Sequence, residues 1–164
     1  MAPKGGMISV IIPTRDSAAV LGPCLSALVP AAVSGLVREV ILADGGSADG
    51  TLAIAEDAGA RLVAGDIAAA VATAKGDWLL ILPPTSRLEP GWEAEAAGHV
   101  ERHAGKAACF RLAFDSASPM ARLREWLASV SRPVAAQGRL IEARLHVDAG
   151  VPVRRLGARA FVSG

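Results

Sequence analysis

Short runs of consecutive apolar residues, separated by polar or glycine-rich turns, recur along the chain. Aliphatic and β-branched residues follow one another in these runs without the alternation of a half-exposed strand, which is typical of strands buried on both faces of a parallel sheet. We therefore predict five strands, the first of them ended by Pro13. They are Ile8–Ile12, Glu39–Ala43, Ala60–Val63, Trp78–Leu82 and Ala107–Phe114.

Amphipathic stretches lie between the predicted strands. Apolar residues recur there at the spacing of one helix face. Asp16 or Ser17 can cap the first helix and Ser47 or Asp49 the second, because short polar side chains accept backbone N–H groups at a helix start. The predicted helices run from Asp16 or Ser17 to about Leu28 and over Thr51–Ala58, Ile67–Ala74, Trp92–His103 and Pro119–Ser129.

The alternation of strands with helices predicts an α/β fold. The connections are short, so we expect one doubly wound, mostly parallel sheet flanked by helices, in a single domain over residues 1–164. Ligands of such sheets bind at the carboxyl ends of the strands. Three polar turns follow predicted strands, and we expect them to converge on that edge. They are Pro13–Asp16, Asp44–Ser47 and Pro83–Ser86.

Composition narrows the range of partners. Of 164 residues 52% are hydrophobic, enough for a sizeable core, but only 4% are aromatic, which argues against a nucleic-acid stacking platform. The net charge of +1 indicates no strongly charged partner. No stretch of about 18 apolar residues occurs, so we expect no membrane span. The widely separated Cys24 and Cys109 predict buried free thiols in a reducing compartment, and we expect a cytoplasmic protein.

The turns and their flanking strands resemble family 2 glycosyltransferases. Ile8–Asp16 resembles the opening strand and loop of that family, and Glu39–Thr51 resembles its second strand and acidic turn. Thr73–Leu82, followed by Arg87–Trp92, is similar to the segment around its metal site. The resemblance implies the A-type nucleotide-sugar-binding fold and transfer of a sugar from a nucleotide-sugar donor to an acceptor. It also implies Mg²⁺ or Mn²⁺ as the cofactor of that reaction.

The same resemblance assigns residues to a nucleotide site. Pro13, Thr14 and Asp16 would line the pocket for the base and ribose. Asp44 would accept a hydrogen bond from the edge of the base, a role that suits a carboxylate because a ring N–H is a donor. Gly45 beside it would let the backbone approach the nucleotide closely.

Departures from the family pattern fall on the catalytic side. The family carries an Asp-x-Asp metal site at the end of its fourth strand, because divalent cations prefer hard oxygen ligands. Here Pro83, Pro84 and Thr85 occupy those positions, so the ligands of Mg²⁺ or Mn²⁺ are missing. Residues 65–72 lack the Arg and Asn that relatives often place near the diphosphate, and they contain Asp66, which would repel phosphate.

A third departure is the absence of the segment that would carry a catalytic base. Relatives place this base on a helix after the segment that residues 148–150 resemble, whereas here the chain runs from Val153 straight into Arg154. The catalytic residues are therefore unknown. The resemblance divides the chain into a nucleotide-binding half at residues 8–92 and a reduced acceptor half at residues 93–164.

Two functions are therefore open. In the first, the chain is a glycosyltransferase of unknown donor and acceptor, in which Arg154, Arg155 and Arg159 take over the charge of the missing metal. In the second, it is a catalytically degenerate module that binds a nucleotide or nucleotide sugar, or that pairs with an active glycosyltransferase or a second copy of itself. Sugar release from a nucleotide sugar supports the first, and thermal stabilisation by a nucleotide without turnover supports the second.

Overall fold

A computed structural model of the chain, which describes residues 6–114, 138–145 and 153–162, contains one eight-stranded sheet. The strands are β1 (Ile8–Thr14), β2 (Val37–Asp44), β3 (Arg61–Ala64), β4 (Trp78–Ile81), β5 (Ser86–Leu88), β6 (Ala107–Phe114), β7 (Arg139–Glu142) and β8 (Val153–Val162). The helices of the described residues are α1 (Ala18–Ser26), α2 (Val29–Val33), α3 (Thr51–Asp57), α4 (Ile67–Thr73) and α5 (Trp92–Arg102), and a 3₁₀ turn covers Ala143–Leu145.

The strand order is β3-β2-β1-β4-β7-β6-β8-β5. The first four strands of this order are parallel, with β1 between β2 and β4. Strand β7 is antiparallel to both β4 and β6, β8 is parallel to β6, and β5 is antiparallel to β8. The predicted doubly wound, mostly parallel α/β sheet is confirmed, and the antiparallel pairs lie in its second half.

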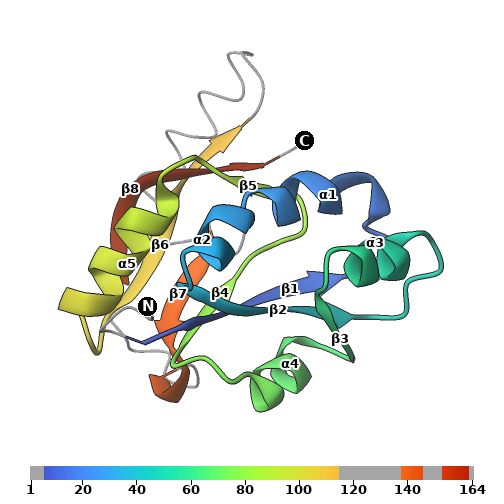
Figure 1. Cartoon of the computed structure of the whole chain (residues 1–164), viewed down its shortest axis with the longest axis horizontal. Helices are drawn as coiled ribbons and strands as arrows, with labels where there is room; N and C mark the ends of the chain where they lie inside the picture. Colours follow the sequence, from blue (N-terminus) through green and yellow to red (C-terminus); the bar gives the residue numbers. More distant parts are fainter. Residues whose placement is uncertain (1–5, 115–137, 146–152, 163–164) are drawn as a thin grey trace.

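Helices cover both faces of the sheet (Figure 1). Successive side chains of β1 point to opposite faces of the sheet, and both sets are largely apolar, so both faces need a cover. Ile8 and Ile12 join the larger core, under α1, α2, α3 and α5, whereas Ile11 joins a smaller core under α4. Both faces of the central strand are therefore dry, which is why its sequence is continuously apolar.

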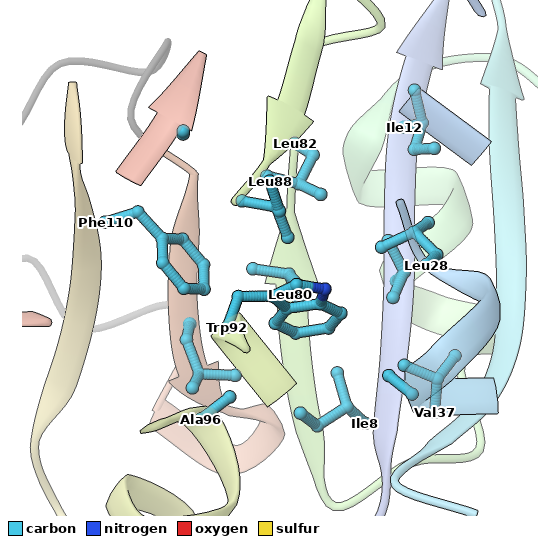
Figure 2. Close-up of a cluster of buried hydrophobic side chains, with 14 of the residues drawn as sticks. Ile8, Ile12, Leu28, Val37, Leu80, Leu82, Leu88, Trp92, Ala96 and Phe110 are labelled. Carbon is cyan, nitrogen blue, oxygen red and sulfur yellow. The ribbon is translucent and has the colours of Figure 1, made fainter. Parts of the chain in front are cut away.

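The larger core is centred on Trp92, the first residue of α5 (Figure 2). Its side chain is 1% exposed and meets the ring of Phe110 edge-on, with the ring centroids 5.9 Å apart. The indole N–H donates to the carbonyl of Ala27, 2.9 Å away, so its polar atom is satisfied inside the core. This bond ties the start of α5 to the end of α1, on the same face of the sheet.

Strand β1 continues two residues beyond the predicted end, through Pro13 to Thr14. The carbonyl of Ile11 accepts the N–H of Leu82, so Ile11 and, two residues on, Pro13 turn their backbone groups toward β4. Strand β4 has already ended at Ile81. The N–H that proline lacks therefore costs no bond of the sheet ladder, and the strand tolerates it.

The first predicted helix ends about two residues early and is followed by a short helix that was not predicted. Helix α1 ends at Ser26 and α2 begins at Val29, with Pro30 in its first turn. Pro23 inside α1 has no N–H to bond the preceding turn, which weakens a longer helix. Ser17, one of the two residues predicted to cap α1, occupies its N-cap without a side-chain capping bond, and Asp16 does not cap this helix. Gly50, rather than Ser47 or Asp49, occupies the N-cap of α3, although Asp49 Oδ1 accepts the N–H of Thr51, the first residue of that helix.

Three strands were not predicted from the apolar pattern. Strands β5 and β7 are short, and β8 alternates exposed arginines with small or apolar buried residues. The predicted strand at Ala107–Phe114 is confirmed with its bounds. The predicted helix at Pro119–Ser129 lies outside the described residues. Within the described ranges, no helix is long and apolar enough to cross a membrane.

Candidate functional site

The parallel register brings two of the predicted turns together. Thr14 at the end of β1 lies beside Asp44 at the end of β2, and the N–H of Gly45 donates to the carbonyl of Thr14 at 2.8 Å. On the other side of β1, the N–H of Leu82 donates to the carbonyl of Ile11 at 3.0 Å. The turn that begins at Pro83 is therefore adjacent to the loop after β1, and all three turns lie at the carboxyl edge.

The carboxylate of Asp44 is the most extensively bonded group at this edge. Its Oδ1 accepts the hydroxyls of Thr14 at 3.1 Å and Ser47 at 2.5 Å, and its Oδ2 accepts the N–H groups of Gly46 at 3.0 Å and Ser47 at 2.9 Å. The side chain is only 9% exposed. Burial raises the pKa of Asp44, but the bonds from Ser47, Gly46 and Thr14 lower it more, so its pKa lies below the usual value.

A set of backbone-to-side-chain bonds joins the loops after β1 and β2. The N–H of Asp16 donates to the hydroxyl of Ser47 at 2.9 Å, and Asp16 Oδ1 accepts the N–H of Ala48 at 2.7 Å. Asp49 accepts the N–H of Ala18 at 3.0 Å and that of Thr51 at 2.9 Å. Asp16 adopts a left-handed backbone conformation, with φ of 47°, which this reciprocal pairing with the second loop holds in place.

A pocket of about 520 Å³ opens beside these loops. Pro13 and Thr14 line it from β1, Ala43 and Gly45 from the end of β2 and the residue after it, and residues 65–68 from the connection after β3 and the start of α4. Three of the residues predicted for the nucleotide site, Pro13, Thr14 and Gly45, therefore face one cavity. Asp44 is not among the lining residues but is bonded to Thr14, which is, and Asp16 lies in the joined loops rather than in the pocket lining.

Asp66 also lines this pocket, and sequence reasoning had treated it only as a charge that repels phosphate. Its side chain caps α4, since Asp66 Oδ1 accepts the N–H of Ala69 at 3.0 Å. An aspartate at an N-cap is a frequent structural choice. The residue thus has a local role in starting α4, and it adds an acidic group to the rim of the pocket.

The turn that the sequence predicts as the counterpart of the family's metal site offers no carboxylate. Pro83, Pro84 and Thr85 form the turn between β4 and β5, and each is half-buried. The carbonyl of Pro83 is contacted by the Cys24 thiol at 3.8 Å, and burial raises the pKa of Cys24 to about 12. No group of three or more His, Cys, Asp or Glu side chains suited to a metal ion occurs in the described part of the chain. The donor set at this turn does not fit Mg²⁺ or Mn²⁺.

Two of the three arginines expected to take over the charge of the metal have other partners. Arg159 forms an ion pair with Glu89 at 3.0 Å, and Arg154 contacts the imidazole of His103 after the end of α5. Sequence reasoning missed a different cation, Arg15, which follows Thr14 directly at the carboxyl edge. Its place in the motif after the first strand was the signal that could have identified it.

Comparisons with known proteins agree with this architecture. The family model for glycosyl transferase family 2 matches residues 9–117, more than half of the chain. A stretch of 89 residues is 40% identical to a TPR repeat-containing protein of Synechococcus elongatus, and it covers 49% of this chain and 21% of that protein.

Solved structures give the same fold. Glucosyl-3-phosphoglycerate synthase from Mycobacterium tuberculosis, in complex with Mn²⁺, UDP and glucosyl-3-phosphoglycerate, is 24% identical with a TM-score of 0.63, over 86% of this chain and 58% of that one. Mannosyl-3-phosphoglycerate synthase from Rubrobacter xylanophilus is 18% identical with a TM-score of 0.62, over 86% of this chain and 55% of that one. The chain thus spans a little over half the length of these enzymes. By its match to the family model over residues 9–117, the chain belongs to glycosyl transferase family 2.

Proposed function

We propose that this chain binds a nucleoside diphosphate or nucleotide sugar in the pocket at the carboxyl ends of β1, β2 and β3. The observation that carries the proposal is the Thr14–Asp44 bond beside a 520 Å³ cavity, at the edge where α/β sheets bind ligands. Similar structures hold UDP with Mn²⁺, which supports a nucleotide as the ligand class. The missing metal-site carboxylates favour a binding module over an active transferase.

The chemistry at Asp44 supports recognition of a base N–H. All four hydrogen bonds to its carboxylate come from the protein, so a nucleotide must share or replace one of them. The bond from Thr14 is the longest, and a hydroxyl hydrogen can rotate away, so this bond is the one that yields. The depressed pKa keeps Asp44 ionised as an acceptor at neutral pH. Pro13 and Gly45 provide the walls, and Asp16 fixes the loop beside the ribose.

A second candidate function is sugar transfer, which family membership favours. In that case residues 8–92 bind the donor and residues 93–164 form a reduced acceptor side, within one domain. The buried free thiols of Cys24 and Cys109 are compatible with a cytoplasmic, reducing setting. The chain can also associate with a second copy of itself or with an active glycosyltransferase. Analytical ultracentrifugation tests either association directly.

Melting curves with UDP, GDP, ADP and CDP test the proposal. A ligand at one hundred times its Kd stabilises the folded state by about 2.7 kcal/mol, which raises the Tm by several degrees. Asp44→Asn is expected to lose the effect, whereas the matched control Asp57→Asn, on the exposed side of α3, is expected to keep it. Flat curves with every nucleotide would refute binding. Release of free sugar from UDP-glucose or GDP-mannose would establish the transferase instead of the binding module.

A further inference from the structure

The turn after β4 lacks the carboxylates that a metal-assisted nucleotide site needs. A diphosphate carries multiple negative charges, and a cation held by carboxylates normally offsets them. The turn at the end of β4 supplies two proline rings and one neutral hydroxyl, from Thr85. One of its carbonyls, that of Pro83, already has the Cys24 thiol as a neighbour. A divalent ion at this turn would exchange its hydration shell for neutral groups only.

Strand order fixes what lies between the pocket and this turn. The pocket is lined by residues at the ends of β1 and β2 and after β3, and β4 is the next strand on the other side of β1. A ligand that extends from the pocket toward the turn at Pro83 must therefore pass the loop after β1. Arg15 is the cationic residue of that loop, directly after Thr14.

The side chain of Arg15 lies over the turn that follows β2. Its Cβ and Cδ are each 3.9 Å from the position that a β-carbon on Gly45 would occupy, so the arginine runs along the face of that glycine. Its backbone is fixed by a bond from its N–H to the hydroxyl of Ser17 at 3.2 Å. The guanidinium is exposed and has no hydrogen-bond or ion-pair partner among the residues that the structure describes.

We propose that the site binds the diphosphate of its nucleotide without a divalent cation, and that the guanidinium of Arg15 neutralises the phosphate charge. The inference rests on the proposed nucleotide-binding function. A guanidinium suits this task because it stays protonated and can donate two parallel N–H bonds to phosphate oxygens. Arg15 is thus a binding residue, which acts in place of the cation that the turn at Pro83–Thr85 does not hold.

Calorimetric titration with UDP and with GDP, each in EDTA and in Mn²⁺, tests the inference. The wild-type Kd is expected to differ by less than about twofold between the two conditions, and Arg15→Gln is expected to weaken binding on the order of tenfold in both. Arg38→Gln, an exposed arginine at the other end of β2, is the matched control and keeps the wild-type Kd. Binding at least tenfold tighter in Mn²⁺ than in EDTA, or an unchanged Kd in Arg15→Gln, overturns the inference.

A variant that restores the carboxylates gives an independent test. Pro83→Asp combined with Thr85→Asp is expected to bind the nucleotide at least tenfold more tightly in Mn²⁺ than in EDTA, while the wild type does not. Circular dichroism and a cooperative melt confirm that the variant is folded. A folded double variant that gains nothing from Mn²⁺ would contradict the assignment of this turn and overturn the inference. Absence of nucleotide binding by the wild type in both conditions would instead refute the proposed function.

Discussion

The hydroxyl of Thr14 donates to Oδ1 of Asp44 at 3.1 Å, across the carboxyl ends of two parallel strands. The other three bonds to this carboxylate come from its own turn, at Gly46 and Ser47. Thr14 is therefore the residue that connects the carboxylate to β1. Thr14 also lines the pocket, so this bond joins the turn after β2 to a residue of the proposed site.

Replacement of Thr14 or of Asp44 tests what this bond contributes to stability and to nucleotide binding. Thr14→Val keeps the shape and removes one neutral donor, and we expect a loss of about 1 kcal/mol in the free energy of unfolding. Asp44→Ala leaves two N–H groups and two hydroxyls without their acceptor, and we expect a loss of about 2–3 kcal/mol together with loss of nucleotide binding. Urea denaturation measures both, with the exposed Ser26→Ala as control. Equal losses in the two variants would contradict the central position of Asp44.

Position 16 should tolerate asparagine, whereas alanine there should destabilise the protein. Its φ of 47° belongs to the left-handed region, which Asn and Asp enter more easily than other non-glycine residues. Asparagine keeps an oxygen that can accept the N–H of Ala48, whereas alanine loses this bond and keeps the strained backbone. We expect Asp16→Asn within about 0.5 kcal/mol of the wild type and Asp16→Ala about 1–2 kcal/mol less stable.

Chemical denaturation of both Asp16 variants checks this order, and Asp16→Gly separates the two causes. Glycine removes the backbone strain but also the hydrogen bond, so its stability should fall between those of the other two. If Asp16→Ala matched the wild type, neither the conformation nor the bond to Ala48 would contribute to the joined loops.

The central parallel strands and the site edge were predictable because each depends on local signals. The apolar run from Ile8 to Ile12 can be stable only when both faces are covered, and the turn at Asp44 follows its strand directly. The alternating strand β8 was not predictable from apolar runs, because its arginines and small residues acquire their pattern only beside β6 and β5.

The chemistry of individual residues was less predictable than their positions. Sequence reasoning identified Asp44 as an acceptor, but its four bonds depend on loops that meet only in the folded chain. Asp16 was predicted to cap a helix, and instead it pairs with the loop after β2. Arg15 is not part of any helix or strand periodicity. Its proposed role in phosphate binding depends on the absence of carboxylates from the turn at Pro83, which lies on the other side of β1.

Two glycines should respond in opposite directions to alanine. A β-carbon on Gly76 would lie 2.5 Å from the N of Ser9 and 2.8 Å from the carbonyl oxygen of Met7, so β1 would have to move. A β-carbon on Gly22, inside α1, would meet nothing within 4 Å. We expect Gly22→Ala to stabilise the protein by about 0.5–1 kcal/mol, because alanine favours the helix. We expect Gly76→Ala to lose several degrees of Tm or to fail to fold, which differential scanning fluorimetry and soluble yield reveal.

Acid should destabilise the fold through His99, which is 2% exposed on α5. Burial lowers the pKa of His99 below 6.5, and the nearby cationic groups His103, Arg154 and Lys106 lower it further, against a raising effect of the bond to the Lys106 carbonyl. That carbonyl is 2.8 Å from Nε2, so Nε2 carries the hydrogen in the neutral ring. Protonation would charge Nδ1, which is buried and has no partner among the described residues.

The sign of the effect follows from linkage. The unfolded chain binds the proton at a higher pH than the folded chain, so the contribution of His99 is complete above about pH 6.5 and is lost as the pH falls toward the lower folded-state pKa. The slope is at most about 1.4 kcal/mol per pH unit. Urea denaturation at pH 7.5 and pH 5.5 should show a smaller decrease for His99→Gln than for the wild type. A decrease of the same size in both proteins would assign the acid sensitivity to other groups.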